Sequence, residues 1–289
     1  MTAFKITRRL WCLATPVPAL IVGALIMRQH DVPASRWGLN LIGGVIAAAV
    51  CSVFLARSRT SMSQTVAMVS SCFVVGALAA TFAVTGSMGV HRWIPIGPLT
   101  MHAGAVCLPL FIVALRVLDA FGGKLRWGPI LLAMAGATLL LLQPDAAQAT
   151  AFAAAVFTLL IASKQRAHAA WVAALVIAAL AGWTWTQRDP LPPVPYVEGI
   201  IGLARQNGPV WLVASIATLA VLPLPFFIGP SGSHSAFVRA LGVYWCVCIL
   251  APFVGHFPVP LVGFGLSPIV GYFVALANLS FSDSHRITI

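Results

Sequence analysis

The sequence contains very little charge, and almost none of it is negative. Asp, Glu, Lys and Arg make up 8% of the 289 residues, the acidic residues number six, and Glu198 is the only glutamate. Hydrophobic residues make up 60% of the chain, and its mean hydropathy is +0.96. These values are outside the range of soluble globular domains. The composition therefore excludes an ordinary soluble domain and predicts a polytopic membrane protein.

The sequence also lacks the spacings of a disulfide framework, a metal site or a nucleotide site. Four of its six cysteines fall inside apolar segments, and the other two, Cys246 and Cys248, point in different directions on a helix. His102 and His256 have no companions at metal-ligand spacing. The inner loops contain no glycine-rich phosphate cradle. We therefore predict no metal ligands and no cytoplasmic nucleotide site.

Apolar runs long enough to cross a bilayer recur from end to end. In lipid a helix satisfies its own backbone hydrogen bonds, so these runs predict an all-α protein with one transmembrane domain over residues 1–289. We expect about ten crossings, at residues 10–27, 37–56, 64–88, 103–118, 127–143, 146–163, 167–186, 209–229, 236–255 and 259–281.

The basic residues give the expected orientation. Lys and Arg number 17 and the isoelectric point is about 10.3, which in a soluble protein would suggest nucleic acid. In a membrane protein, basic residues collect in cytoplasmic loops. With both termini in the cytoplasm, 12 of the 17 lie inside, and the outer side holds only Arg28, Arg36, Arg92, Arg188 and Arg205. The expected partner is the membrane, with no nucleic acid.

This orientation gathers the distinctive polar residues on the outer face. Gln143-Pro144-Asp145 closes one apolar run directly before the next, so Asp145 either caps the following helix or faces the outer water and holds a cation or arginine. Arg92 is the natural candidate. Arg92 and Trp93 are either an interfacial anchor or a site for an anionic ligand such as a lipid diphosphate.

The longest outer loop covers residues 187–208, between the seventh and eighth crossings, and four prolines stiffen its first half. Residues 196–204 could then form a short interfacial helix that places Glu198 and Arg205 on one face. The loop is either a solvated connector or the carrier of a general base, Glu198.

These elements together resemble the SEDS (FtsW/RodA/SpoVE) family of bacterial cell division, rod shape and sporulation proteins. The resemblance rests on Arg92-Trp93-Ile94, on Gln143-Pro144-Asp145, on the long outer loop, and on Pro258-Val259-Pro260 leading into Phe264-Gly265-Leu266-Ser267. It covers most of the chain from about Gly86, and the first three crossings match only as hydrophobic segments.

The resemblance implies a ten-helix fold in the bacterial inner membrane. It also implies polymerisation of lipid II, a disaccharide-pentapeptide on undecaprenyl diphosphate, beside a single-pass transpeptidase or other division protein. The family's key aspartate follows a Pro-x-x-His-x-Asp pattern. Its place falls on Glu198 when counted from Pro193 and on Val197 when counted back from Gly208. Gln143, Asp145, Arg92, Trp93 and Arg205 are then the candidate substrate-binding residues, with a divalent cation as an optional cofactor.

The chain departs from the family's pattern at several polar positions. His102-Ala103-Gly104-Ala105 stands where the family has Gln-Pro-Ser-Glu, Leu108 replaces a lysine, and Arg205-Gln206 replaces paired glutamates. The leading expectation is a lipid II polymerase with Glu198 as base and Arg92 near the diphosphate. The alternatives are a non-catalytic scaffold that binds a transpeptidase, and a flippase for lipid-linked precursors.

Overall fold

The computed structural model of the protein describes residues 10–57, 62–120, 127–162, 168–187, 189–228 and 235–279. Many of the basic residues behind the predicted orientation lie outside these ranges: Lys5, Arg8, Arg9, Arg59, Lys124, Arg126, Lys164, Arg166, Arg188 and Arg286.

Apolar helices make up most of the described chain, and each of the ten predicted crossings coincides with one of them. Five are long and apolar enough to span a membrane: Leu10–Gln29, Ala34–Ala56, Gln64–Ala83, Pro209–Phe227 and Ala236–Phe253. Five shorter apolar helices supply the rest. The protein is therefore a polytopic helical membrane protein, as predicted, and crossing by the five shorter helices stays a prediction.

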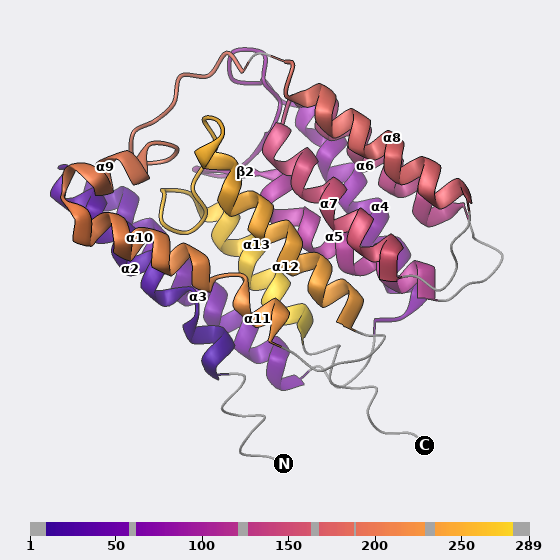
Figure 1. The fold of residues 1–289 in the computed structure, drawn as a ribbon, viewed down its shortest axis with the longest axis horizontal. Helices are drawn as coiled ribbons and strands as arrows, with labels where there is room; N and C mark the ends of the chain where they lie inside the picture. The colour runs from indigo at the N-terminus through magenta and orange to yellow at the C-terminus, as the bar shows by residue number, and fades with distance from the viewer. Residues whose placement is uncertain are drawn as a thin grey trace.

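The helices fall into two groups with a pair between them (Figure 1). On one side α2 (Val17–Gln29) packs on α3 (Ala34–Arg57) and on α10 (Pro209–Val221), which continues through α11 (Leu224–Phe227). On the other side are α4 (Gln64–Ala80), α5 (Ala103–Ala120), α6 (Gly128–Leu142), α7 (Ala146–Ala162) and α8 (His168–Thr184). Between them, α13 (Leu266–Ala277) packs on both α3 and α5, and α12 (Ser235–Leu250) packs on α7.

Several helix ends differ from the predicted ones because of local breakers. The third helix ends at Ala80, followed by the 3-10 helix η1 (Thr81–Ala83), so the predicted run to residue 88 is too long. Pro223 separates α10 from α11, and α12 gives way to the 3-10 helix η2 (Ala251–Phe253). Proline removes a backbone donor and clashes with the preceding turn, which explains the break at Pro223.

A β-hairpin lies between α4 and α5, which the all-α prediction did not include. Strand β1 (Trp93–Ile96) pairs antiparallel with β2 (Leu99–His102), with Trp93 opposite His102. Gly97 in the two-residue turn has a φ of +60°, which glycine adopts without steric cost. The hairpin brings Trp93 back beside the first turn of α5.

The last helix begins seven residues later than predicted, because residues 259–265 are irregular and buried among other elements. Asn40 of α3 donates to the Gly263 carbonyl (2.9 Å) and accepts from the Gly265 amide (3.1 Å). The Val259 and Phe264 amides donate to the carbonyls of Val197 and Tyr196 in the outer loop (3.2 and 2.9 Å). Irregular backbone at this depth is tolerated because these partners satisfy its polar groups.

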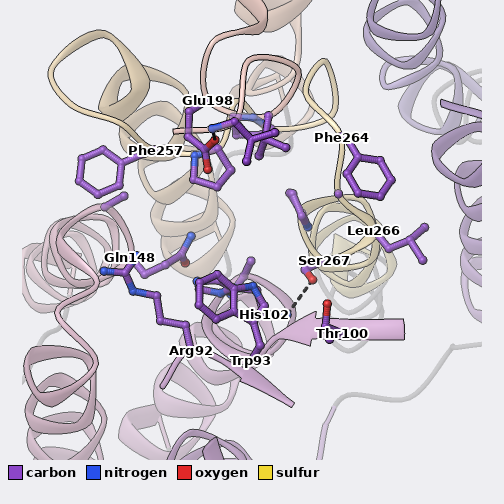
Figure 2. A pocket seen from close by; sticks show the side chains of 18 of the residues that line it. Arg92, Trp93, Thr100, His102, Gln148, Glu198, Phe257, Phe264, Leu266 and Ser267 are labelled. Atoms are coloured by element: carbon purple, nitrogen blue, oxygen red, sulfur yellow. Dashed lines mark hydrogen bonds between the residues drawn. The ribbon is translucent and has the colours of Figure 1, made fainter. Parts of the chain in front are cut away.

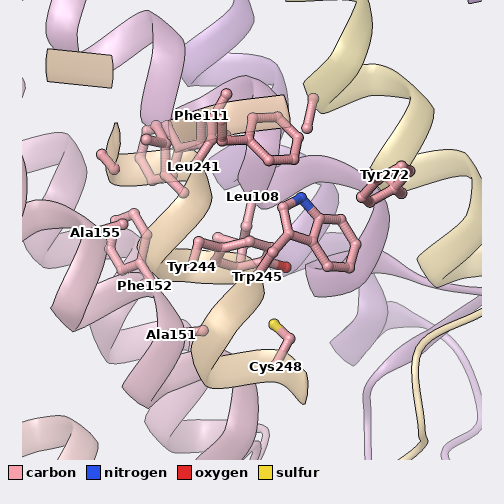
Figure 3. Packing of buried hydrophobic residues seen from close by; sticks show 14 of the residues in the cluster. Leu108, Phe111, Ala151, Phe152, Ala155, Leu241, Tyr244, Trp245, Cys248 and Tyr272 are labelled. Atoms are coloured by element: carbon pink, nitrogen blue, oxygen red, sulfur yellow. The ribbon is translucent and has the colours of Figure 1, made fainter. Parts of the chain in front are cut away.

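Aromatic side chains from α5, α7, α12 and α13 form the centre of the bundle (Figure 3). The rings of Trp245 and Tyr272 meet edge to face with centroids 5.2 Å apart, and Phe111 stacks on Phe152 at 5.4 Å. The Tyr272 hydroxyl donates to the Leu222 carbonyl (2.7 Å). Van der Waals packing and satisfied polar groups of this kind hold helices together in lipid.

Both described ends of the chain lie at the same end of the bundle. Gln29, at the end of α2, accepts a hydrogen bond from Asn207, just after α9 (Ile200–Gln206), while α13 starts beside β2, where Ser267 accepts from the His102 amide (2.8 Å). The outer loop and β2 therefore mark one end, and the start of α2 and the finish of α13 point to the other. Which end faces the cytoplasm stays a prediction.

Candidate functional site

A cavity of about 350 Å³ lies at the end of the bundle that carries the hairpin and the outer loop. Its walls come from the hairpin, the starts of α3, α5, α7 and α13, the end of α12, the outer loop and the segment 256–265. Figure 2 shows Glu198 on one side of this space and Arg92, Trp93 and His102 on the opposite side. Elements far apart in sequence thus bring the scarce polar residues around one space.

Arg92 is held rigidly in the wall of the cavity. Its side chain is only 7% exposed, and its Nη1 lies 2.7 Å from an oxygen of Asp189. Nε donates to the Gln143 carbonyl (3.0 Å), and Nη2 donates to the Pro144 carbonyl. The predicted approach of Arg92 to the Gln143-Pro144-Asp145 turn is therefore seen, but its bonds go to two backbone carbonyls there, and its carboxylate partner is Asp189.

Asp145 both caps a helix and pairs with a side chain. Its Oδ1 accepts from the Gln148 amide (3.2 Å) in the first turn of α7, and its Oδ2 lies 3.1 Å from His102 Nε2, off the line of a hydrogen bond. Burial by itself raises the pKa of this carboxyl, but the adjacent His102, with a further contribution from Arg92, outweighs it and holds the pKa below the usual aspartate range. Of the two readings of Asp145 left open by the sequence, the helix cap is therefore present, whereas the carboxylate is buried beside His102 and does not hold the arginine.

His102 is oriented from both sides. Its Nδ1 accepts from the Ala105 amide (3.2 Å), which assigns the proton of the neutral ring to Nε2, the nitrogen that faces Asp145. Trp93 meets the imidazole edge to face, with ring centroids 5.7 Å apart. With Nδ1 occupied and the proton on Nε2, His102 has no free lone pair to act as a base, and it lies against Asp145.

Gln143 is buried behind the wall that contains Arg92 and does not line the cavity. It is fully buried, and its side-chain amide donates to the Leu78 carbonyl (3.0 Å) and the Thr81 hydroxyl (2.9 Å). Its own carbonyl accepts from Arg92. The residue predicted to bind substrate thus connects η1 and the end of α4 to the arginine.

Glu198 lines the cavity from the outer loop. Its Oε2 accepts from the Val194 amide (2.7 Å) and closes a turn, and the side chain is half-buried. Burial raises the pKa of this carboxyl above the usual glutamate value, although the hydrogen bond from Val194 acts in the opposite direction. A carboxylate with a raised pKa in a cleft has the properties of a general base.

Arg205 does not share a helix face with Glu198. The predicted helix over residues 196–204 begins only at Ile200, because Val194 to Gly199 form the turn that Glu198 closes. Arg205 lies in the last turn of α9 and is absent from the lining of the cavity. Of the residues predicted from sequence, Arg92, Trp93, Asp145 and Glu198 come together around the cavity, Gln143 lies behind it and Arg205 lies apart.

Sequence reasoning missed several residues of the site. Asp189, Arg36, Ser267 and the pair Gln148–Tyr244, in which Tyr244 donates to Gln148 (2.6 Å), also line the cavity. His102 was expected only to pack or contact headgroups. Gln148 could have been predicted, because it follows Asp145 by three residues and so lies about one helical turn away on the same face.

The divalent cation that the sequence allowed stays a prediction. Among the described residues, no three His, Cys, Asp or Glu side chains come together as a metal site. Asp145 and Glu198 already accept bonds from backbone amides.

The fold and the site together define a polytopic membrane protein with a polar cavity at one end of its helices. Searches by sequence find no matching protein-family model and no matching curated protein. Known structures do match. The rod shape determining protein RodA of Thermus thermophilus aligns with a TM-score of 0.61 at 16% identity, covering 96% of this chain and 97% of RodA.

Two further structures give the same result. An aspartate-to-alanine mutant of that RodA aligns with a TM-score of 0.60 at 16% identity, over 96% of this chain and 98% of the mutant. A chain from a peptidoglycan synthase complex described as coordinating polymerization and crosslinking aligns with a TM-score of 0.61 at 18% identity, over 96% and 98%. The protein therefore has the fold of RodA, and the SEDS resemblance drawn from its sequence is confirmed at the level of the fold.

Proposed function

We propose that this protein synthesises peptidoglycan in the bacterial inner membrane, polymerising a lipid II-type substrate at the outer face. The observation that carries the proposal is the cavity in which Glu198 lies opposite Arg92 and His102, in a chain with the RodA fold (Figure 2). In RodA-like folds the cavity would receive a disaccharide joined to undecaprenyl diphosphate.

In the proposed reaction Glu198 acts as general base. Its carboxylate takes the proton from an acceptor sugar hydroxyl, whose oxygen bonds to the anomeric carbon of the donor as the bond to undecaprenyl diphosphate breaks. The diphosphate leaves with the electron pair, and a cation beside the cavity stabilises its negative charge. The raised pKa of Glu198 brings the base nearer to the operating pH.

The test is polymerisation of lipid II by the purified full chain. Glu198→Gln keeps an oxygen that can accept from the Val194 amide but removes the base, so we expect turnover to fall by roughly 100- to 10,000-fold while the Tm is unchanged. Glu198→Ala also removes the hydrogen bond, so it should lose turnover and some stability. Turnover by Glu198→Gln at the level of the unsubstituted protein would remove Glu198 as the base.

A second function is favoured by how the charges of the site are used. Glu198 closes a backbone turn and Arg92 is neutralised by Asp189, as expected of a scaffold that keeps the fold without catalysis. In that role the chain would bind a single-pass transpeptidase or another division protein. Co-purification of such a partner, with no turnover of any lipid-linked donor, would support the scaffold, and turnover by the protein alone would contradict it.

Movement of lipid-linked precursors across the membrane is less well supported. Tyr244 and Trp245 line the cavity, and both are fully buried in the aromatic centre of the bundle (Figure 3). A transport path would need a polar route to the opposite end. This packing is an argument against one.

A further inference from the structure

A second arginine lies beside the cavity, away from Arg92. Arg36 is in the first turn of α3, and its guanidinium carbon lies 5.3 Å from the centre of the Phe264 ring. Figure 2 shows Phe264 and Leu266 across the cavity from Arg92. The cavity therefore has one cation at each side.

The two arginines differ in how many of their side-chain nitrogens already bind other groups of the protein. Arg92 is buried and uses all three of its side-chain nitrogens on Asp189 and two backbone carbonyls. Arg36 is exposed. Among the residues that the structure describes, the carboxylates that lie against a basic side chain are Asp189 beside Arg92 and Asp145 beside His102, and neither contacts Arg36. An incoming anion would have to displace Asp189 at Arg92, whereas it would meet an uncommitted cation at Arg36.

The aromatic ring under Arg36 is held in place by backbone bonds. The Phe264 amide donates to the Tyr196 carbonyl (2.9 Å), and Asn40 bonds to both Gly263 and Gly265. A guanidinium over a fixed ring is held by its attraction to the ring face while its planar fork of N–H groups can still bind two phosphate oxygens at once. The arrangement prepares Arg36 for an anion.

An exposed apolar stripe continues from this end of the cavity along α3. Leu39 lines the cavity, and Ile42, Ile46 and Val50, on the same helix face, are 61%, 59% and 52% exposed. In a membrane such a stripe contacts hydrocarbon chains. A ligand with a phosphate head at Arg36 could therefore extend its chain along α3 without leaving the bilayer.

We propose that Arg36 binds the phosphate groups of a polyprenyl diphosphate lipid whose chain lies along the Leu39–Val50 face of α3. The inference rests on the proposed function for the class of ligand, and it assigns the diphosphate to Arg36 where the sequence had suggested Arg92. Arg92 then serves to tie the outer loop to the hairpin through Asp189.

The test is equilibrium binding of radiolabelled undecaprenyl diphosphate to the full chain in phosphatidylcholine nanodiscs. Arg36→Gln should weaken binding roughly 10- to 100-fold, the effect of losing hydrogen bonds to a charged group. Arg36→Lys, which keeps the charge without the planar fork, should lose less. Arg28→Gln is the matched control: Arg28 is exposed on the same side in the last turn of α2, does not line the cavity, and should bind as the unsubstituted protein does.

Competition identifies the source of the phosphate. Unlabelled undecaprenyl diphosphate should displace the label far better than inorganic pyrophosphate or phosphatidylglycerol, because only it has both the diphosphate and the isoprenoid chain. Equal displacement by either competitor would overturn the lipid assignment. Unchanged binding by Arg36→Gln, or no binding by the unsubstituted protein, would overturn the proposal.

Failure of this inference can be told from failure of the proposed function. Loss of binding in Arg36→Gln, in a protein that shows no polymerisation, would support the diphosphate site and contradict the polymerase. Polymerisation with unchanged KM and unchanged binding in Arg36→Gln would support the polymerase and contradict the site.

Discussion

The two sides of the cavity use their charges in opposite ways. On the wall side, Arg92 and Asp145 are buried and His102 is partly buried, and the polar groups of the hairpin and of the neighbouring helix ends surround them. On the loop side, Glu198 is half-buried with one backbone bond, and Arg36 is exposed over an aromatic ring. A buried charge needs several partners to offset its desolvation, and these partners leave it little freedom to bind anything else. The wall side therefore fixes the shape of the site, and the loop side offers the groups that can meet a substrate.

The largest effect should come from replacing Arg92, the arginine buried in the wall. Arg92→Gln leaves the Gln143 and Pro144 carbonyls and Asp189 without their donor, so we expect a loss of about 3–5 kcal/mol, chiefly from the two carbonyls left unsatisfied in the wall. Thermal unfolding in detergent measures it. Arg36→Gln is the contrast and should cost under about 1 kcal/mol, the worth of an exposed cation–π contact. Similar losses in both variants would contradict the division between the two sides.

The wall can also be displaced through its packing against α13. A Cβ on Gly271 would lie 1.9 Å from the Ala105 carbonyl oxygen, and backbone cannot swing aside as a side chain can. Gly271→Ala should therefore cost about 1–3 kcal/mol by separating α13 from α5. Gly202→Ala on α9 is the matched control, because nothing lies within 4 Å of its Cβ. A Tm for Gly271→Ala equal to that of the control would show that the close approach is not required.

The pH dependence of activity tests the role of Glu198 on the loop side. Burial raises the pKa of Glu198, and the base must be ionised, so activity should fall as the pH drops through a value above the usual glutamate range. On the acid side we expect about a tenfold loss per pH unit. Because the folded pKa is raised, ionising Glu198 also costs stability as the pH rises through this window. A kcat/KM profile measures it, and an acid limb at the usual glutamate value would contradict the assignment.

The smallest effect should come from the ion pair that joins the two sides. The Asp189 side chain is 32% exposed, so solvent screens its pairing with Arg92. Asp189→Asn keeps an oxygen for Nη1 and should cost about 1 kcal/mol or less. Faster proteolysis of the outer loop, with an unchanged Tm, is the expected result. A fall in Tm as large as that of Arg92→Gln would show that Asp189 belongs to the buried wall.

Much of the fold could be predicted because the membrane imposes a simple rule. Each apolar run of sufficient length has to form a helix, and all ten predicted runs coincide with apolar helices. The failures occur where polar backbone is satisfied by distant partners. The amides of Val259, Phe264 and Gly265 bond to Val197, Tyr196 and Asn40, so the stretch 259–265 does not need to be helical.

The candidate site was predictable in part for a related reason. A charge at the end of an apolar run is conspicuous, as Arg92 and Asp145 are, and Glu198 is conspicuous as the only glutamate, within the longest outer loop. Their partners were not conspicuous. Asp189 follows Arg92 by 97 residues, and His102 reaches Asp145 only because the hairpin turns the chain back.

The sequence by itself determined that the chain is a bundle of membrane helices, because scarce charge and long apolar runs leave no other stable way to satisfy the backbone in lipid. Only the tertiary structure decided which charges neutralise one another and which remain for a ligand. That choice depends on burial and on distances of a few ångströms between segments far apart in the chain, and composition and spacing do not contain them.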